Sequence, residues 1–206
     1  MSLAPTDYDF GAPANYAFAE KITCSNDEAR RMYIEAFGHM LNYNHEQAIA
    51  CFTKCTELDP NCAMAWWGIA YCLSSSYNWS AGLGPGYDAI SQAVSLKDHC
   101  SELEQDLIMA LSKRHTKEAR DNANPAALNM GNSPELNQAF ADAMAPLYEK
   151  YSGDLDVTAV YVEALMNLNP WTLWNKDAST GEITPVDDST LMPVSYTHLT
   201  LPTMDS

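Results

Sequence analysis

The sequence is poor in basic residues: 11 Lys and Arg stand against 27 Asp and Glu, which gives a net charge of −16 over 206 residues. Surfaces that bind phosphate backbones or anionic lipids need clustered Lys and Arg. We therefore expect neither nucleic acid nor a membrane as a partner, and an acidic surface that favours a basic one. No apolar run approaches the ~20 residues of a membrane span. The first residues also lack the basic and apolar regions of a signal peptide, so we expect a cytoplasmic protein.

Motifs for catalysis, phosphate binding and metal binding are also missing. There is no G-x-S-x-G, Walker loop, G-x-G-x-x-G or H-E-x-x-H. The six cysteines form no C-x-x-C pair, and Cys51 and Cys55 are followed by no His or Cys at zinc-finger spacing. We expect packed, reduced thiols and structural or surface histidines, with a metal or redox site as the alternative. We expect no catalytic residue, no metal and no cofactor.

Apolar side chains recur at helical spacing in about seven stretches, and no convincing strand occurs, so the fold class is all-α. Capping boxes predict helix starts at Ser25–Glu28 and Ser101–Glu104, and Ser133-Pro134 predicts another. Prolines end two of the helices, after residues 58 and 168. The Gly-rich stretch 74–86 and the polar stretch 115–132 are expected to be loops.

A repeat underlies these helices. Ala36 and Ala70 lie 34 residues apart, the period of the tetratricopeptide repeat (TPR). Ala48-x-x-x-Phe52 followed by Pro60 matches the second helix of that motif, and Trp66-x-x-Ile69-Ala70 matches the first helix of the next repeat. The match is weaker for the predicted helix behind Ser25, where Glu35 occupies an apolar position.

Two stretches carry a closer resemblance, Asp59-Pro60-Asn61-Cys62-Ala63-Met64-Ala65-Trp66-Trp67-Gly68-Ile69-Ala70 and Tyr161-Val162-Glu163-Ala164-Leu165-Met166-Asn167-Leu168 with Pro170-Trp171 and Leu173-Trp174. They resemble a family of largely uncharacterised TPR proteins that is common in bacteria. The resemblance covers roughly residues 25–192. It implies a right-handed superhelix of helical hairpins and supplies no catalytic residues.

We accordingly divide the chain into four parts. Residues 1–24 are an irregular arm, 25–169 a TPR-like helical domain, and 170–193 a loop or truncated next repeat with a short helical start near Asp188. Residues 194–203 resemble a translated sequencing adapter, so we expect 194–206 to be a non-native tail that replaces further repeats. The alternative is a genuine, β-prone tail.

The first helix of each repeat lines the concave face of a TPR array, and projection onto this chain assigns six residues to that groove: Arg30, Tyr33, Phe37, Met64, Trp67 and Tyr71. Trp67 is assigned there because Trp66 fills the packing position and adjacent rings cannot both point inward. Exposed aromatic rings in a groove suit a peptide or a partner helix. We therefore predict a non-catalytic interaction module that binds a partner protein or peptide. The alternative for these residues is packing against the arm 1–24.

Two other functions are relevant to this sequence. The TPR domains that clamp chaperone C-termini use Lys and Asn where this chain has Tyr33 and Phe37, so the resemblance excludes that carboxylate clamp. The alternative to an interaction module is an enzyme or small-molecule-binding protein. Its pocket would lie near the Gly-rich loop 77–87, around Tyr77, Asn78, Trp79 and Tyr87, and a missing C-terminal region would complete it.

Overall fold

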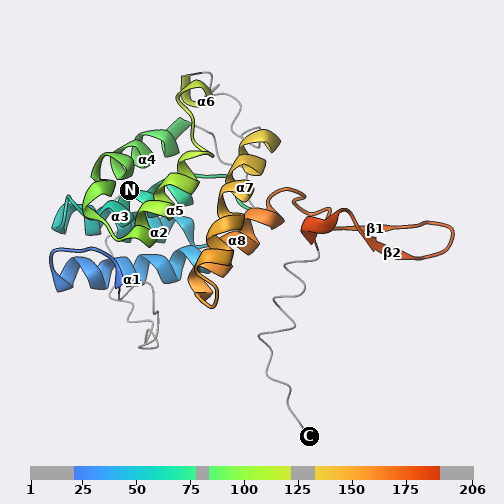
Figure 1. Ribbon diagram of the computed structural model, residues 1–206, viewed down its shortest axis with the longest axis horizontal. Helices are drawn as coiled ribbons and strands as arrows, with labels where there is room; N and C mark the ends of the chain where they lie inside the picture. Colours follow the sequence, from blue (N-terminus) through green and yellow to red (C-terminus); the bar gives the residue numbers. More distant parts are fainter. Residues whose placement is uncertain (1–20, 78–83, 122–132, 191–206) are drawn as a thin grey trace, which may run out of the picture. The chain divides into compact units, whose positions relative to one another are not determined.

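The computed structural model describes residues 21–77, 84–121 and 133–190 (Figure 1). These residues are mostly helical, in agreement with the predicted all-α class. They form eight α-helices, two short strands and two 3₁₀ turns: α1(Asp27–Leu41), α2(His45–Leu58), α3(Ala63–Cys72), α4(Gly84–Leu96), η2(Lys97–His99), α5(Glu102–Ser112), α6(Lys117–Asp121), α7(Pro134–Lys150), α8(Leu155–Met166), β1(Trp174–Lys176), β2(Ile183–Pro185) and η3(Asp188–Thr190). None of the helices in these ranges is long and apolar enough to cross a membrane.

The chain divides into two compact units. The first holds Met1–Ser75 and Ser80–Asn132, and the second holds Ser76–Trp79 and Ser133–Ser206. In the first unit α1 packs against α2, α2 against α3, α3 against α4 and α4 against α5. Alternate helices also meet: α1 with α3, α3 with α5 and α4 with α6. In the second unit α7 packs against α8, α8 against η3, and β1 pairs with β2. The predicted tail 194–206 lies outside the described residues.

Of the two predicted capping boxes, one is confirmed and the other is wrong. Ser101 Oγ accepts from the Glu104 amide, and the Glu104 carboxylate accepts from the Ser101 amide at 2.8 Å, as predicted. The capping box predicted at Ser25–Glu28 is wrong, because the side chain of Asn26 caps α1 by accepting from the Ala29 amide at 2.8 Å. The Ser25 amide instead donates to the carboxylate of Asp59 at 2.6 Å.

The expectation that the chain contains no strand is also wrong. Residues 174–176 and 183–185 form an antiparallel hairpin within the segment predicted as a loop. The carboxylate of Asp177 organises the turn by accepting from the Ser179 amide at 2.7 Å and the Thr180 amide at 2.8 Å. Gly181 takes the positive φ of 74° that the turn requires. Three-residue strands are too short to leave an alternating pattern, which explains the error.

Two short helical elements lie at Asp188–Thr190 and Lys117–Asp121. The short helical start expected near Asp188 is confirmed as η3. The polar stretch 115–132, predicted as a loop, contains the short helix α6, in which Lys117 and Asp121 pair one turn apart. The remainder of that stretch, 122–132, lies outside the described residues.

The close contact between α2 and α3 depends on Gly68. A Cβ atom built at Gly68 would lie 2.3–2.6 Å from three ring atoms of Phe52, which is fully buried. Real Cβ atoms do not approach ring carbons so closely. The missing side chain therefore allows α3 to rest directly on the Phe52 ring.

Replacing Gly68 by Ala is expected to lower the free energy of unfolding by about 1–3 kcal/mol, the usual cost of overpacking a core. The intrinsic helix preference of Ala over Gly would act in the opposite direction, so destabilisation identifies the clash. Urea denaturation of the variant measures the change. Combining Gly68→Ala with Phe52→Leu should cost less than the sum of the two single changes, and strict additivity would contradict the contact.

The buried carboxylates of Asp59 and Glu104 bind residues 25 and 23, which precede α1. Asp59 accepts from the amides of Ser25 at 2.6 Å and Asn61 at 3.1 Å. Glu104, also buried, accepts from the Thr23 amide and the Thr23 hydroxyl, each at 2.7 Å. Burial by itself raises the pKa of Asp59, but the hydrogen bonds from Ser25 and Asn61 outweigh it and leave that pKa below its ordinary value.

Asp59 should therefore stabilise the fold in a pH-dependent way. A carboxylate with a lowered folded-state pKa contributes fully above its unfolded pKa and loses that contribution as the pH falls through the folded one. Asp59→Asn is expected to lower the free energy of unfolding at neutral pH by about 1–3 kcal/mol, and the difference from wild type should shrink below about pH 4. Urea denaturation at several pH values tests this, with exposed Asp27→Asn as the control. A difference that stays constant into acid would contradict the account.

Candidate functional site

The six residues predicted to line an open groove are largely enclosed. Tyr33, Phe37, Met64, Trp67 and Tyr71 are all buried. Arg30 is half-buried, and its guanidinium donates to the carbonyl oxygens of Ile22 at 2.8 Å and Cys24 at 3.3 Å.

The rings among these residues make core contacts. Tyr33 lies 5.4 Å from Phe52 between ring centroids, and Trp67 lies 5.1 Å from Tyr71. The expectation that these aromatic side chains are exposed is therefore wrong. The contacts of Arg30 fall within the predicted arm 1–24, of which residues 1–20 lie outside the described residues.

The two neighbouring tryptophans exchange their predicted roles. Trp67 is 1% exposed, and its indole N–H donates to the Leu107 carbonyl of α5 at 3.1 Å. Trp66 is only half-buried, and its N–H reaches the Pro60 carbonyl at 3.4 Å. The physical reason is that α5 packs against α3 on the side from which Trp67 projects. That side of α3 is therefore core within the first unit.

The glycine-rich region beside the alternative pocket contains a buried serine–histidine pair. Ser74 Oγ lies 2.7 Å from His115 Nε2, and the same hydroxyl donates to the Ala70 carbonyl at 2.9 Å. The direction of the hydrogen bond between Ser74 and His115 depends on the histidine tautomer, and the Ser74 hydroxyl also bonds back to the Ala70 carbonyl, one helical turn earlier. A Cβ at Gly86 would lie 2.2 Å from the His115 ring, so the glycine makes room for this pair. The pair links the end of α3 to residue 115 within the first unit.

Two of the four residues assigned to that pocket lie in the described part of the chain. Asn78 and Trp79 lie outside the described residues. Tyr87 lies in the first unit, with the Arg120 guanidinium 5.8 Å from its ring centroid. Tyr77 belongs to the second unit, where its ring stacks on Trp171 at 5.3 Å.

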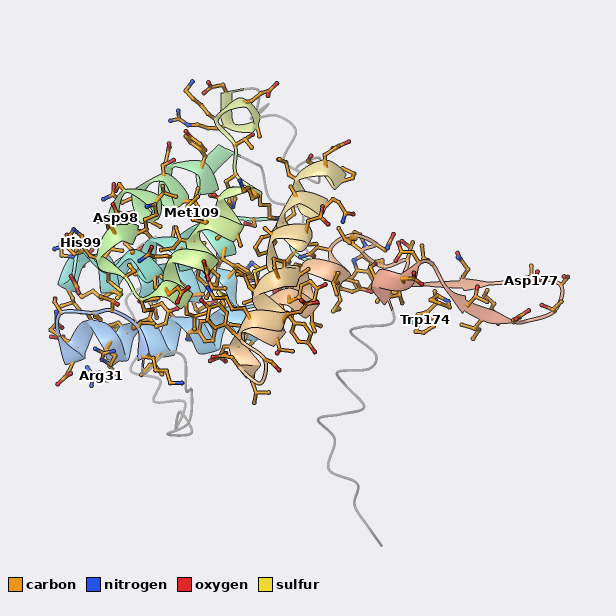
Figure 2. The ribbon with its side chains drawn as sticks, viewed as in Figure 1. Arg31, Asp98, His99, Met109, Trp174 and Asp177 are labelled. Carbon is orange, nitrogen blue, oxygen red and sulfur yellow. The ribbon has the colours of Figure 1, made fainter. Side chains whose placement is uncertain are left out.

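Exposed apolar side chains gather around the hairpin of the second unit. In the described parts of the chain, Trp171 is 72% exposed, Ile183 63% and Trp174 46%. Figure 2 shows Trp174 on this hairpin and Asp177 at its turn. Three large apolar residues are thus exposed within 13 positions of the sequence, and exposed apolar surface that is contiguous marks interaction sites.

The register gives the hairpin two chemically different faces. Trp174 pairs with Pro185, and Lys176 pairs with Ile183. Residues two apart on a strand share a face, so these four side chains lie on one side, which we call the apolar hairpin face. The central pair, Asn175 and Thr184, lies on the opposite, polar side.

The two outer edges of the hairpin also differ. The Val186 amide donates to the Leu173 carbonyl, and the Asp177 amide donates to the Glu182 carbonyl. Because hydrogen-bonded pairs alternate along an antiparallel ladder, the amides of Trp174 and Lys176 point outward from β1. On β2 the outward positions are Ile183 and Pro185, and proline has no N–H to donate. The β1 edge is therefore the more open to an added strand.

Acidic residues outnumber basic ones along the hairpin segment. Residues 174–188 contain Asp177, Glu182, Asp187 and Asp188 against the single base Lys176. Hydrogen bonds from the Ser179 side chain and from the backbone of residues 179 and 180 lower the pKa of Asp177 to about 2. The turn carboxylate thus stays charged throughout the physiological range. The surface combines an apolar face, an open strand edge and negative charge.

Comparisons with known proteins add no assignment: no protein-family model, curated protein or solved structure matches the chain. The candidate site therefore rests on its own geometry. The sequence analysis did not predict the hairpin site, although Trp171 and Trp174 belong to the stretch that carries the family resemblance. The signal in the sequence that could have indicated a hairpin is the Asp177–Gly181 turn between two short β-prone runs.

Proposed function

We propose that the chain is a cytoplasmic, non-catalytic binding protein whose hairpin binds a basic, extended segment of a partner protein. The segment would add to the β1 edge and lay alternate side chains on the apolar hairpin face, a recognised mode of peptide recognition. One observation carries this proposal: the exposed Trp174 and Ile183 share a face beside an edge with two outward amides. The sequence also predicts an interaction module, but this proposal places the binding surface on the hairpin instead of in the helical groove.

The charge of the chain favours a basic partner over a second copy of itself. The second unit carries ten acidic residues against Lys150 and Lys176 over residues 133–190. Two such surfaces repel each other at low ionic strength, whereas a lysine-bearing segment is attracted and steered to the site. A hairpin of two short strands is also marginal by itself, so an added strand would stabilise it.

We further propose a TPR-like arrangement for the first unit. In such arrays each helix packs against the next one and against the next but one, because every hairpin stacks on its neighbour. The contacts of α1 with α2 and α3, and of α3 with α4 and α5, support this arrangement. The helical unit then acts as a folded scaffold, and it has no catalytic role in this proposal.

A synthetic peptide that alternates lysine and valine tests the proposed function. Fluorescence anisotropy of the labelled peptide should report saturable binding to the full chain, weakened by added salt. A peptide in which glutamate replaces lysine should bind at least about tenfold more weakly, equivalent to ~1.4 kcal/mol. A lysine–valine peptide with N-methylated amides should also lose binding, because it cannot pair with a strand edge.

Three results would overturn the proposal. Equal binding of the lysine and glutamate peptides would remove the electrostatic argument, and equal binding of the N-methylated peptide would remove strand addition. Absence of binding by all three, together with a concentration-dependent dimer that Ile183→Ser abolishes, would identify a second copy of the chain as the occupant. Sedimentation velocity of the wild type and of Ile183→Ser distinguishes this last case.

A further inference from the structure

A cluster of three different metal-ligating side chains lies between α1 and α2, in the first unit. Glu35 and His39 come from α1 and Cys51 comes from α2. One carboxylate oxygen, one imidazole nitrogen and the thiol sulfur all lie within 4.8 Å of one another. From this arrangement we infer that Glu35, His39 and Cys51 form a zinc-binding site.

The backbone positions these ligands well. Glu35 and His39 are four residues apart, so they project from one face of α1, one turn above the other. The helix α2 packs along α1 and brings Cys51 to that face. Tetrahedral zinc with bonds of about 2.0–2.3 Å would hold its ligand atoms about 3.3–3.8 Å apart. Because the three ligand atoms lie within 4.8 Å of one another, each pair needs to approach by at most about 1–1.5 Å to reach this geometry.

The ligand set selects the metal. Calcium and magnesium are bound by oxygen atoms, whereas a thiolate, an imidazole and a carboxylate together suit zinc. Three protein ligands leave a fourth tetrahedral position for water or another small ligand. Cys51 and His39 are buried and Glu35 is half-buried, so the open position is expected on the Glu35 side.

Two features of the metal-free protein bear on binding. Burial lowers the pKa of His39, which favours the neutral imidazole, the form that binds a metal. Burial, and then the charge of Glu35, raises the pKa of Cys51 to about 11. The thiol must therefore give up its proton when the metal binds, as cysteine ligands generally do. The negative charge of Glu35 compensates in part by attracting the cation.

Cobalt(II), a spectroscopic substitute for zinc, tests this site in the full chain. Titration of the reduced protein should produce a near-ultraviolet thiolate-to-cobalt charge-transfer band that saturates at one ion per chain and disappears when zinc is added. Cys51→Ser should abolish the band. Glu35→Gln should weaken zinc binding at least about tenfold, the loss produced even by changes in groups that only orient a ligand.

Matched variants separate the site from general effects. Cys72→Ser removes another buried thiol, and Glu46→Gln removes an exposed carboxylate from α2; both should bind cobalt as the wild type does. Circular dichroism checks that each variant folds, and if Cys51→Ser does not fold, Glu35→Gln and His39→Gln decide the question. The absence of a charge-transfer band in the wild type would overturn the proposal. So would cobalt binding that Glu35→Gln and His39→Gln leave unchanged.

Discussion

Replacing Trp67 by Ala is expected to lower the free energy of unfolding by about 3–5 kcal/mol, the range for removing a large aromatic side chain from a core. The indole ring is 1% exposed, lies 5.1 Å from Tyr71 between ring centroids, and donates to the Leu107 carbonyl at 3.1 Å. Its loss would leave a cavity between α3 and α5 and would remove the donor that the Leu107 carbonyl accepts from. Urea denaturation followed by far-ultraviolet circular dichroism measures the change without relying on tryptophan fluorescence.

The adjacent tryptophan supplies the control. Trp66 is half-buried and donates over a longer distance, 3.4 Å, to Pro60. Trp66→Ala should therefore cost clearly less than Trp67→Ala, by about 2 kcal/mol or more. Equal losses, or a larger loss at Trp66, would contradict the placement of these two rings. Trp67→Phe should recover part of the stability, because it keeps an aromatic ring but lacks the indole donor.

Replacing both Trp174 and Ile183 by Ala is expected to weaken binding of the lysine–valine peptide about 100-fold, or ~2.7 kcal/mol. Such a loss is typical when central apolar anchors of an interface are removed. Both side chains are largely exposed, at 46% and 63%, so the stability of the free protein should change little. Anisotropy titration with the labelled peptide provides the measurement.

The matched control changes the other face of the same hairpin. Asn175 and Thr184 form the pair between Trp174–Pro185 and Lys176–Ile183, with side chains on the polar side. Replacing both by Ala should leave peptide binding within about threefold of wild type. If this control loses as much peptide affinity as the Trp174 and Ile183 variant, binding depends only on the hairpin being folded and not on which face is changed. The peptide would then not rest on the apolar face.

Much of the helical architecture is predictable because its signals are local. The capping box at Ser101–Glu104 and the start at Ser133-Pro134 follow from side chains that satisfy the first amides of a helix. The roles of Trp66 and Trp67 were not predictable in this way. Helical spacing defines faces, but which face is buried depends on where α5 packs, and no local pattern encodes that position.

The two proposed sites illustrate the same limit. Glu35 is a polar residue at an apolar repeat position, and that mismatch is the sequence signal for the cluster with His39 and Cys51. Their meeting depends on the register between α1 and α2, which spacing along one helix does not give. The hairpin was missed because its strands are three residues long and its pairing depends on the turn at Asp177–Gly181.

Hydrogen exchange at single amides of the hairpin, followed by NMR with and without the lysine–valine peptide, tests the central claim most directly. The amides of Trp174 and Lys176 point away from the hairpin and should exchange quickly in the free protein. They should become protected when the peptide pairs with β1, while the inward Asn175 amide changes less. Unchanged exchange at Trp174 and Lys176 under saturating peptide, or protection confined to Ile183, would contradict strand addition at the β1 edge.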